Sequence, residues 1–110
     1  MMDEQVFHRA ADEALEAARQ ALLPAADEHD FEVDYNAGVL NLEFEEPAPA
    51  RFVVSPNTPV RQIWVSALSK SFKLDWSEAS RTFVLPETGE TLNQLLARVA
   101  GQHLGAPVSL

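Results

Sequence analysis

The sequence predicts an α+β domain in which two helices pack on one face of an antiparallel sheet of about six strands. Three observations lead to this architecture. Apolar residues recur at helical spacing near both ends of the chain, short runs of alternating apolar and polar residues fill the middle, and the segments between those runs are only turns or short loops. A sheet covered by helices on one face leaves its other face exposed to solvent.

The first helix is predicted between Asp3 and Leu23, where apolar residues recur every three or four positions and alanine is frequent. Pro24 is expected to end this helix, because proline lacks the backbone N–H that a helix interior needs. The polar side of the helix carries three carboxylates, which are Asp12, Glu13 and Glu16.

Two strands joined by a tight turn are predicted next. Residues 31–36 and residues 40–45 both alternate apolar with polar side chains, and Asn36-Ala37-Gly38 between them is typical of a hairpin turn. The outer face of this hairpin is strongly acidic. After a rigid Pro-Ala-Pro-Ala connection, further short strands are predicted at residues 52–55, 61–66, 71–76 and 81–85.

The fourth strand, which Pro59 is expected to precede, contains the most informative side chain. Ile63 and Val65 alternate with Gln62 and Trp64, and successive strand residues point to opposite faces of a sheet. If Ile63 and Val65 face the core, Trp64 stands beside Gln62 on the solvent-exposed face and is a candidate contact point. The alternative places Trp64 in the core and turns Ile63 and Val65 toward a second packed layer.

The second helix is predicted after Thr91, which forms a capping-box pattern with Gln94 three residues later. Leucine and valine then recur at helical spacing, and the helix is expected to end at Gly101 or Gly105.

The composition limits the classes of protein to which the chain can belong. With 110 residues, of which 46% are apolar, it can bury the core of one domain, and we expect residues 1–110 to form a single domain. It contains no cysteine, which excludes disulfides, thiolate zinc sites, cysteine nucleophiles and iron–sulfur clusters bound directly by thiolates.

Acidic residues dominate the charge and are unevenly distributed. The formal net charge of −9 disfavours nucleic acid and anionic membranes as partners, because both require a basic surface. Residues 1–50 hold thirteen Asp or Glu and two Arg, whereas residues 51–110 hold four acids and six bases. This asymmetry predicts an acidic surface region that attracts cations or a basic protein. The alternative is a solvated acidic face that only keeps the protein soluble.

Catalytic and targeting motifs are absent from the sequence. It contains no Ser/His/Asp motif, Gly-rich phosphate loop or HExxH spacing, so we expect no enzyme and assign no catalytic residue. His29 is the one histidine that is close in sequence to several acids, and we interpret it as a solvated loop residue. The acidic start and the lack of an apolar run approaching ~18 residues predict a soluble cytoplasmic protein.

Several segments, taken in order, resemble the frataxin family. They are Phe7–Asp12, Asn36–Leu40, Pro59–Trp64, and Ser69–Trp76 followed by Thr88–Leu92, and together they span nearly the whole chain. Without a presequence, the chain is similar to the bacterial, CyaY-type branch; a mature mitochondrial fragment is the alternative. The resemblance implies a frataxin-like two-layer α/β sandwich. It also implies an iron-binding adaptor or regulator of iron–sulfur cluster assembly that docks on a cysteine desulfurase and on an iron–sulfur scaffold protein.

The resemblance also implies weak binding of Fe²⁺ or Fe³⁺ at an exposed acidic ridge, since carboxylate oxygens suit both ions. The ridge positions in this sequence are Glu13, Glu16, Asp27, Glu28, Asp30, Glu32 and Asp34. Arg19, Leu23 and Pro24 stand where relatives commonly carry carboxylates, so we expect fewer or weaker metal sites than in those relatives.

On the exposed sheet face, the resemblance implies that Asn57, Gln62 and Trp64 contact the scaffold protein. Gln62 and Trp64 match the family pattern, whereas Ser55 and Asn57 do not match cleanly. We expect a monomer. Two other functions fit the same residues: an iron store or donor that forms iron-driven oligomers, or an acidic interaction module without a physiological metal. Weak ferroxidase activity is expected at most as a side activity of bound iron.

Overall fold

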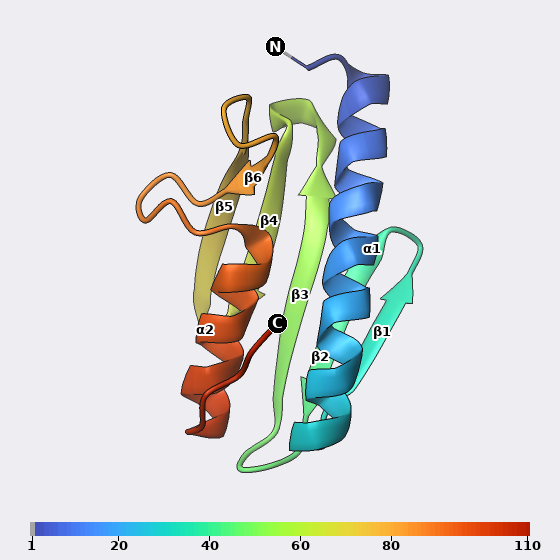
Figure 1. Ribbon diagram of the computed structural model, residues 1–110. Helices are drawn as coiled ribbons and strands as arrows, with labels where there is room; N and C mark the ends of the chain where they lie inside the picture. Colours follow the sequence, from blue (N-terminus) through green and yellow to red (C-terminus); the bar gives the residue numbers. More distant parts are fainter. Residues whose placement is uncertain (1) are drawn as a thin grey trace.

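The computed structural model describes residues 2–110 and contains two helices that cover one sheet. In chain order the elements are α1 (Glu4–His29), β1 (Glu32–Asn36), β2 (Val39–Phe44), β3 (Ala50–Asn57), the 3-10 turn η1 (Thr58–Val60), β4 (Gln62–Ala67), β5 (Lys70–Ser77), β6 (Thr82–Val84) and α2 (Leu92–Leu104). The six strands pair antiparallel in sequence order, and α1 and α2 lie on the same face of the sheet (Figure 1). The predicted α+β two-layer architecture is confirmed.

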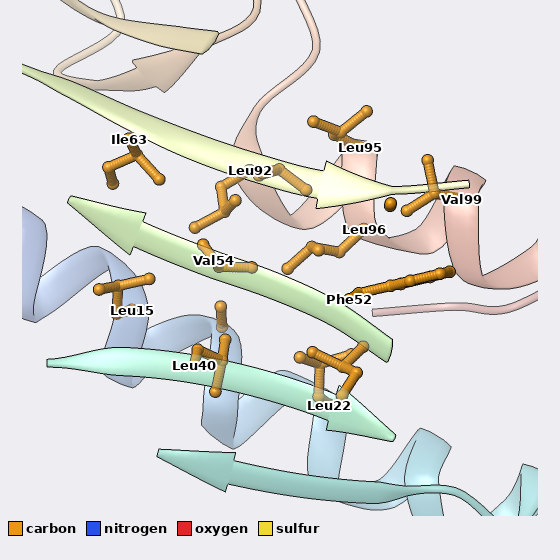
Figure 2. Packing of buried hydrophobic residues seen from close by; sticks show 14 of the residues in the cluster. Leu15, Leu22, Leu40, Phe52, Val54, Ile63, Leu92, Leu95, Leu96 and Val99 are labelled. Carbon is orange, nitrogen blue, oxygen red and sulfur yellow. The ribbon is translucent and has the colours of Figure 1, made fainter. Parts of the chain in front are cut away.

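The hydrophobic core lies between the helices and the sheet. Leu15 and Leu22 on α1 and Leu96 on α2 point toward Leu40 and Val54 on the sheet, as Figure 2 shows, and all five are fully buried. The buried positions of α1 follow the predicted helical spacing; they are Phe7, Ala11, Leu15, Ala18, Leu22, Ala25 and Ala26. One shared core therefore holds both layers together.

Side-chain caps fix where the helices begin. The Asp3 carboxylate accepts a hydrogen bond of 2.8 Å from the backbone N–H of Val6 at the start of α1. Thr91 and Gln94 form the predicted capping box, with hydrogen bonds of 3.3 and 2.9 Å. Of the two predicted ends of α2, the structure selects Gly105, which takes the left-handed conformation that glycine adopts without strain.

The prediction that Pro24 ends the first helix was wrong. The helix α1 continues through Pro24 to His29 and ends at Asp30, whose N–H bonds the carbonyl of Ala26. Proline removes the hydrogen bond to the carbonyl of Gln20, but both residues are exposed, so water can satisfy that carbonyl. Ala25 and Ala26, only 4% and 8% exposed, bury the next turn against the core and favour its continuation.

Strand boundaries also differ from the predicted ones around Pro59. Strand β3 extends to Asn57, and residues 58–60 form the turn η1, so that β4 begins only at Gln62. Arg61 takes a left-handed conformation, with φ of 55°, which separates the turn from the strand. The strand that the sequence predicted from residue 61 therefore exists, and only its first residue belongs to the turn.

The β1–β2 hairpin turns at Ala37 and Gly38, which have φ values of 54° and 79°. Two successive positive φ angles match the twist of antiparallel strands, so the predicted hairpin is confirmed. Its turn has two residues, and Asn36 is the last residue of β1. The turn places Tyr35 opposite Leu40 and Glu32 opposite Glu43.

Candidate functional sites on the ridge and the open sheet face

Six of the seven acidic residues predicted to form the ridge lie along the margin where α1 meets β1. Glu13 instead lines a hollow with Trp76 and Phe83, on the β5–β6 side of α1. Glu13 and Glu16 are on α1, and Asp27, Glu28 and Asp30 lie at its C-terminal end. Glu32 and Asp34 are on the edge strand β1, which lies beside α1 in Figure 1. All are exposed except Glu16, which is half-buried. The structure therefore separates Glu13 from the other six predicted residues.

The ridge is also divided between the two layers of the fold. Val33 and Tyr35 pack against the core, so the alternating Glu32 and Asp34 of β1 point toward the open face, away from the helices. Among residues 2–110, no group of three or more His, Asp or Glu side chains converges closely enough to hold a metal ion. The donor type fits iron, but the described geometry offers no enclosed site.

On the helix, Glu16 is engaged by its own neighbours. Arg19 donates two hydrogen bonds to its carboxylate, of 2.9 and 2.7 Å, and Gln20 donates one of 3.3 Å. These bonds, with that from Arg19 as the largest cause, lower the pKa of Glu16. A cation must therefore compete with the Arg19 guanidinium for this predicted ligand.

Tyr35 is a residue of this margin that sequence reasoning did not single out. Burial is the largest cause that raises the pKa of its phenol, followed by the negative charges of Asp12 and Glu16. The helical carboxylates therefore face the phenol of β1 across the layer boundary. Only the packing of α1 on β1 brings Tyr35 close to these carboxylates, so no local pattern in the sequence could have indicated this proximity.

A hollow of about 550 Å³ lies where β1, β2 and β3 meet the β2–β3 connection. Its acidic lining residues are Asp30, Glu32, Glu43, Glu45 and Glu46. Only Asp30 and Glu32 were predicted as site residues. The acidic outer face of the hairpin was a signal for Glu43 and Glu45, whereas the connection folds back to add Glu46.

Charge in this hollow is only partly compensated. Glu32 lies directly opposite Glu43 on the neighbouring strand, and like charges in such positions repel. Arg51 of β3 lies opposite Glu43 on its other side and makes a 2.8 Å ion pair with it. The hollow thus keeps a negative surface that attracts cations or basic side chains.

His29 and His103 add little to the ridge or to the acidic hollow. His29 lies in the last turn of α1 and not in a loop, and its Nε2 is 3.4 Å from the Glu28 carboxylate. His103 packs against the ring of Phe44, with ring centroids 4.8 Å apart, and its Nε2 is 3.0 Å from the carbonyl oxygen of Ala48. His103 therefore fastens α2 to the β2–β3 connection.

Trp64 lies on the face of the sheet that the helices leave open, as the alternation predicted. Ile63 and Val65 are 0% and 1% exposed and face the core, whereas Gln62 and Trp64 are half-buried on the other side. Asn57 pairs with Gln62 in the β3–β4 register, so the three predicted contact residues are neighbours. The alternative, with Trp64 in the core, is wrong.

A hydrogen-bond relay orients Trp64 on this open face. Its indole N–H donates to Gln62 Oε1 at 2.9 Å, and the Gln62 amide donates to Asp75 Oδ1 at 2.8 Å. The Lys73 ammonium lies 4.8 Å from the centroid of the Trp64 ring. Lys73 and Asp75 were visible as polar positions of a strand, but their partners depend on the β4–β5 register, which the sequence does not specify.

Comparison with known proteins gives consistent results. The family model of the frataxin-like domain matches residues 1–106. The iron–sulfur cluster assembly protein CyaY of Azotobacter vinelandii is 31% identical over 106 residues, covering 94% of this chain and 91% of the relative. The protein of the same name from Pseudomonas putida strain GB-1 is also 31% identical, with the same coverage.

A solved structure supports the fold independently. Frataxin from Psychromonas ingrahamii, studied as a member of the CyaY protein family, superposes with a TM-score of 0.75. The two sequences are 19% identical, and the match covers 98% of this chain and 97% of the other. At that identity the likeness establishes the arrangement of helices and strands. Within residues 2–110, no helix is long and apolar enough to cross a membrane.

Proposed function

The chain belongs to the frataxin-like domain family, and from this premise we propose that it is an adaptor in iron–sulfur cluster assembly. In this proposal it carries no catalytic site of its own and acts in the bacterial cytoplasm as a monomer. One surface binds a cysteine desulfurase and another binds the iron–sulfur scaffold protein. Its lack of cysteine supports an accessory role, since the cluster must be built on another protein's thiolates.

The observation that carries the proposal is the separation of two different surfaces. The ridge and the adjoining hollow are acidic and only partly compensated, whereas the open face presents Trp64 held by Gln62. Acidic surfaces attract basic partners over long range, while an ordered tryptophan provides the large contact area typical of binding hot spots. Two partners of different chemistry can therefore be bound side by side, as an adaptor requires.

We propose the basic partner surface to be that of the desulfurase, docking on the ridge around Asp27, Glu28 and Asp30. All three are exposed at the C-terminal end of α1. Contacts between such exposed charges weaken with salt, because the Debye length falls to about 8 Å at physiological ionic strength. The scaffold contact at Trp64 depends less on charge and should be less sensitive to salt.

Iron is a cargo of the ridge in this proposal. Exposed carboxylates bind Fe²⁺ and Fe³⁺ through oxygen, but separate side chains on a helix and a strand give low affinity and little selectivity. The absence of three converging ligands among residues 2–110 and the Arg19 pair on Glu16 both favour weak binding by one or two carboxylates at a time. A storage role would need many such sites brought together in oligomers.

The test is a reconstituted cluster-assembly reaction with purified desulfurase and scaffold proteins, run with and without this chain. A change in the assembly rate is expected on addition of the chain; its direction depends on the partner enzyme. Pull-down with the same two proteins then separates the surfaces. Replacing Asp27, Glu28 and Asp30 with lysine should abolish desulfurase capture and leave scaffold capture intact.

A matched control compares a ridge double variant (Asp27→Lys, Glu28→Lys) with a charge reversal of two acids outside both surfaces. Glu78 and Glu87 lie exposed in the loops that follow β5 and β6, and their replacement by lysine changes net charge without touching the ridge. If the control variant loses desulfurase binding equally, overall charge and not the ridge explains the loss in the ridge variant. No effect of the chain on assembly, together with no capture of either protein, would reject the adaptor function.

A further inference from the structure

We propose that Asp75 is a positioning residue for the Trp64 surface: acting through Gln62, it holds the indole in one orientation for the partner. This inference rests on the proposed function, because the orientation of Trp64 matters only if the open face binds another protein. It adds a residue on a different strand, β5, to a contact surface that the sequence predicted on β3 and β4 alone.

The strand register brings the three side chains together. Gln62 and Trp64 are two residues apart on β4 and so share a face, and Asp75 lies directly opposite Gln62 on β5. The relay follows: the indole N–H donates to the Gln62 amide oxygen at 2.9 Å, and the Gln62 amide nitrogen donates to Asp75 at 2.8 Å. Each donor in the relay meets an acceptor.

The carboxylate of Asp75 decides which way the Gln62 amide points. An ionised carboxylate only accepts hydrogen bonds, so the NH₂ group of Gln62 must turn toward Asp75. Its carbonyl oxygen is then left facing Trp64, where it accepts the indole N–H. Without an acceptor at position 75, the amide is free to reverse, and its NH₂ group would then oppose the indole N–H. Asp75 therefore acts on Trp64 without touching it.

The indole is restrained on its face as well as on its edge. Lys73, directly opposite Trp64 in the register, places its ammonium 4.8 Å from the ring centroid. Lys73 makes no ion pair in the described part of the chain. The surface therefore offers a fixed apolar ring, whose N–H is already used, bordered by a free ammonium. It fits a partner with apolar side chains next to a carboxylate.

These bonds lie at the surface and add little to stability, which makes their effect on orientation separable from folding. Asp75 is exposed, and Gln62 and Trp64 are half-buried. Exposed hydrogen bonds compete with water and have small net worth. Their effect on binding is larger, since a side chain that is already ordered loses less freedom when the partner arrives.

The experiment compares Asp75→Ala with Asp75→Asn, because both remove the charge and only asparagine keeps an acceptor oxygen. Glu78→Ala is the control for loss of a nearby exposed charge. The first readout is the NMR signal of the Trp64 indole N–H in the free protein, with the Trp76 indole as internal reference. The second is affinity for purified iron–sulfur scaffold protein of Azotobacter vinelandii.

In Asp75→Ala the Trp64 indole N–H should exchange faster with solvent, and scaffold affinity should fall by up to about tenfold, the cost of ordering one side chain on binding. Asp75→Asn and Glu78→Ala should stay within about twofold of wild type. An unchanged indole signal, or unchanged affinity despite a changed signal, overturns the positioning role. If the wild-type chain itself binds no scaffold, the proposed docking function fails and the positioning role fails with it.

Discussion

Replacing Pro24 with alanine should stabilise the protein, because Pro24 lies inside α1 and not at its end. Proline in a helix interior costs about 3 kcal/mol relative to alanine, through the lost hydrogen bond and the clash of its ring with the preceding turn. The carbonyl left without its partner belongs to Gln20 and is on an exposed part of the helix, so water recovers part of this cost. Alanine also increases the conformational entropy of the unfolded state, which lowers the free energy of unfolding by about 0.4–1 kcal/mol and opposes the stabilisation.

The net effect is an increase of about 1–2 kcal/mol in the free energy of unfolding, or roughly 5–10 °C in melting temperature for a domain of this size. Urea and thermal denaturation followed by circular dichroism measure it. The control is Pro86→Ala in the exposed loop after β6, where no helical hydrogen bond is restored and stability should fall by about 0.4–1 kcal/mol.

Equal or lower stability of Pro24→Ala would refute this expectation and indicate that the helix ends at Pro24 in solution. Backbone NMR shifts of residues 25–29 provide an independent check, since they report directly whether this turn is helical. The outcome bears on function as well. Asp27 and Glu28 have their observed positions beside β1 only if the helix continues through Pro24.

Three further changes test the ridge, the acid stability and the open face. Arg19→Gln should raise the pKa of Glu16 toward its ordinary value of 4.5, because the Arg19 hydrogen bond is the largest cause that lowers this pKa. NMR titration measures the pKa of Glu16. An unchanged pKa would show that the Arg19–Glu16 pair does not form in solution. The pKa of Glu90 is lowered mainly by the hydrogen bonds that Arg98 donates to it. The pair therefore stabilises the folded state at pH values above the ordinary carboxyl pKa. This stabilisation is lost as the pH falls through the lowered pKa of Glu90. Glu90→Gln should therefore be less stable than wild type near neutral pH, and in urea denaturation the difference should disappear once the pH lies below the lowered pKa; a constant difference at all pH values would contradict this. Trp64→Ala should cost less than about 1.5 kcal/mol in the same measurement, whereas a loss of about 3–5 kcal/mol would place the indole in the core.

The fold was predictable where local pattern and tertiary packing agree. The alternation around Trp64 and the capping box at Thr91 each depend on neighbouring residues only, and both are confirmed. Pro24 was mispredicted because burial of the following alanines, which depends on the whole core, outweighs a local helix-breaking preference. The acidic hollow and the Asp75 relay depend on strand register and on a returning connection. Sequence periodicity gives the face of each side chain but not its neighbour on the next strand.

The arrangement of charge and register on the two surfaces implies different kinds of specificity. On the ridge, the carboxylates lie on separate elements and face solvent, so any cation or basic side chain lowers their mutual repulsion, and in the proposed function iron and the desulfurase compete for the same groups. On the open face, the indole N–H of Trp64 and the amide of Gln62 have defined partners, and the Lys73 ammonium lies over the ring. A contacting protein must therefore fit a fixed ring and an ammonium. Neutralising the ridge should therefore leave the relay intact, because no residue of the relay lies on α1 or β1. In the proposed function, iron can therefore change the affinity of the desulfurase while the scaffold protein stays bound.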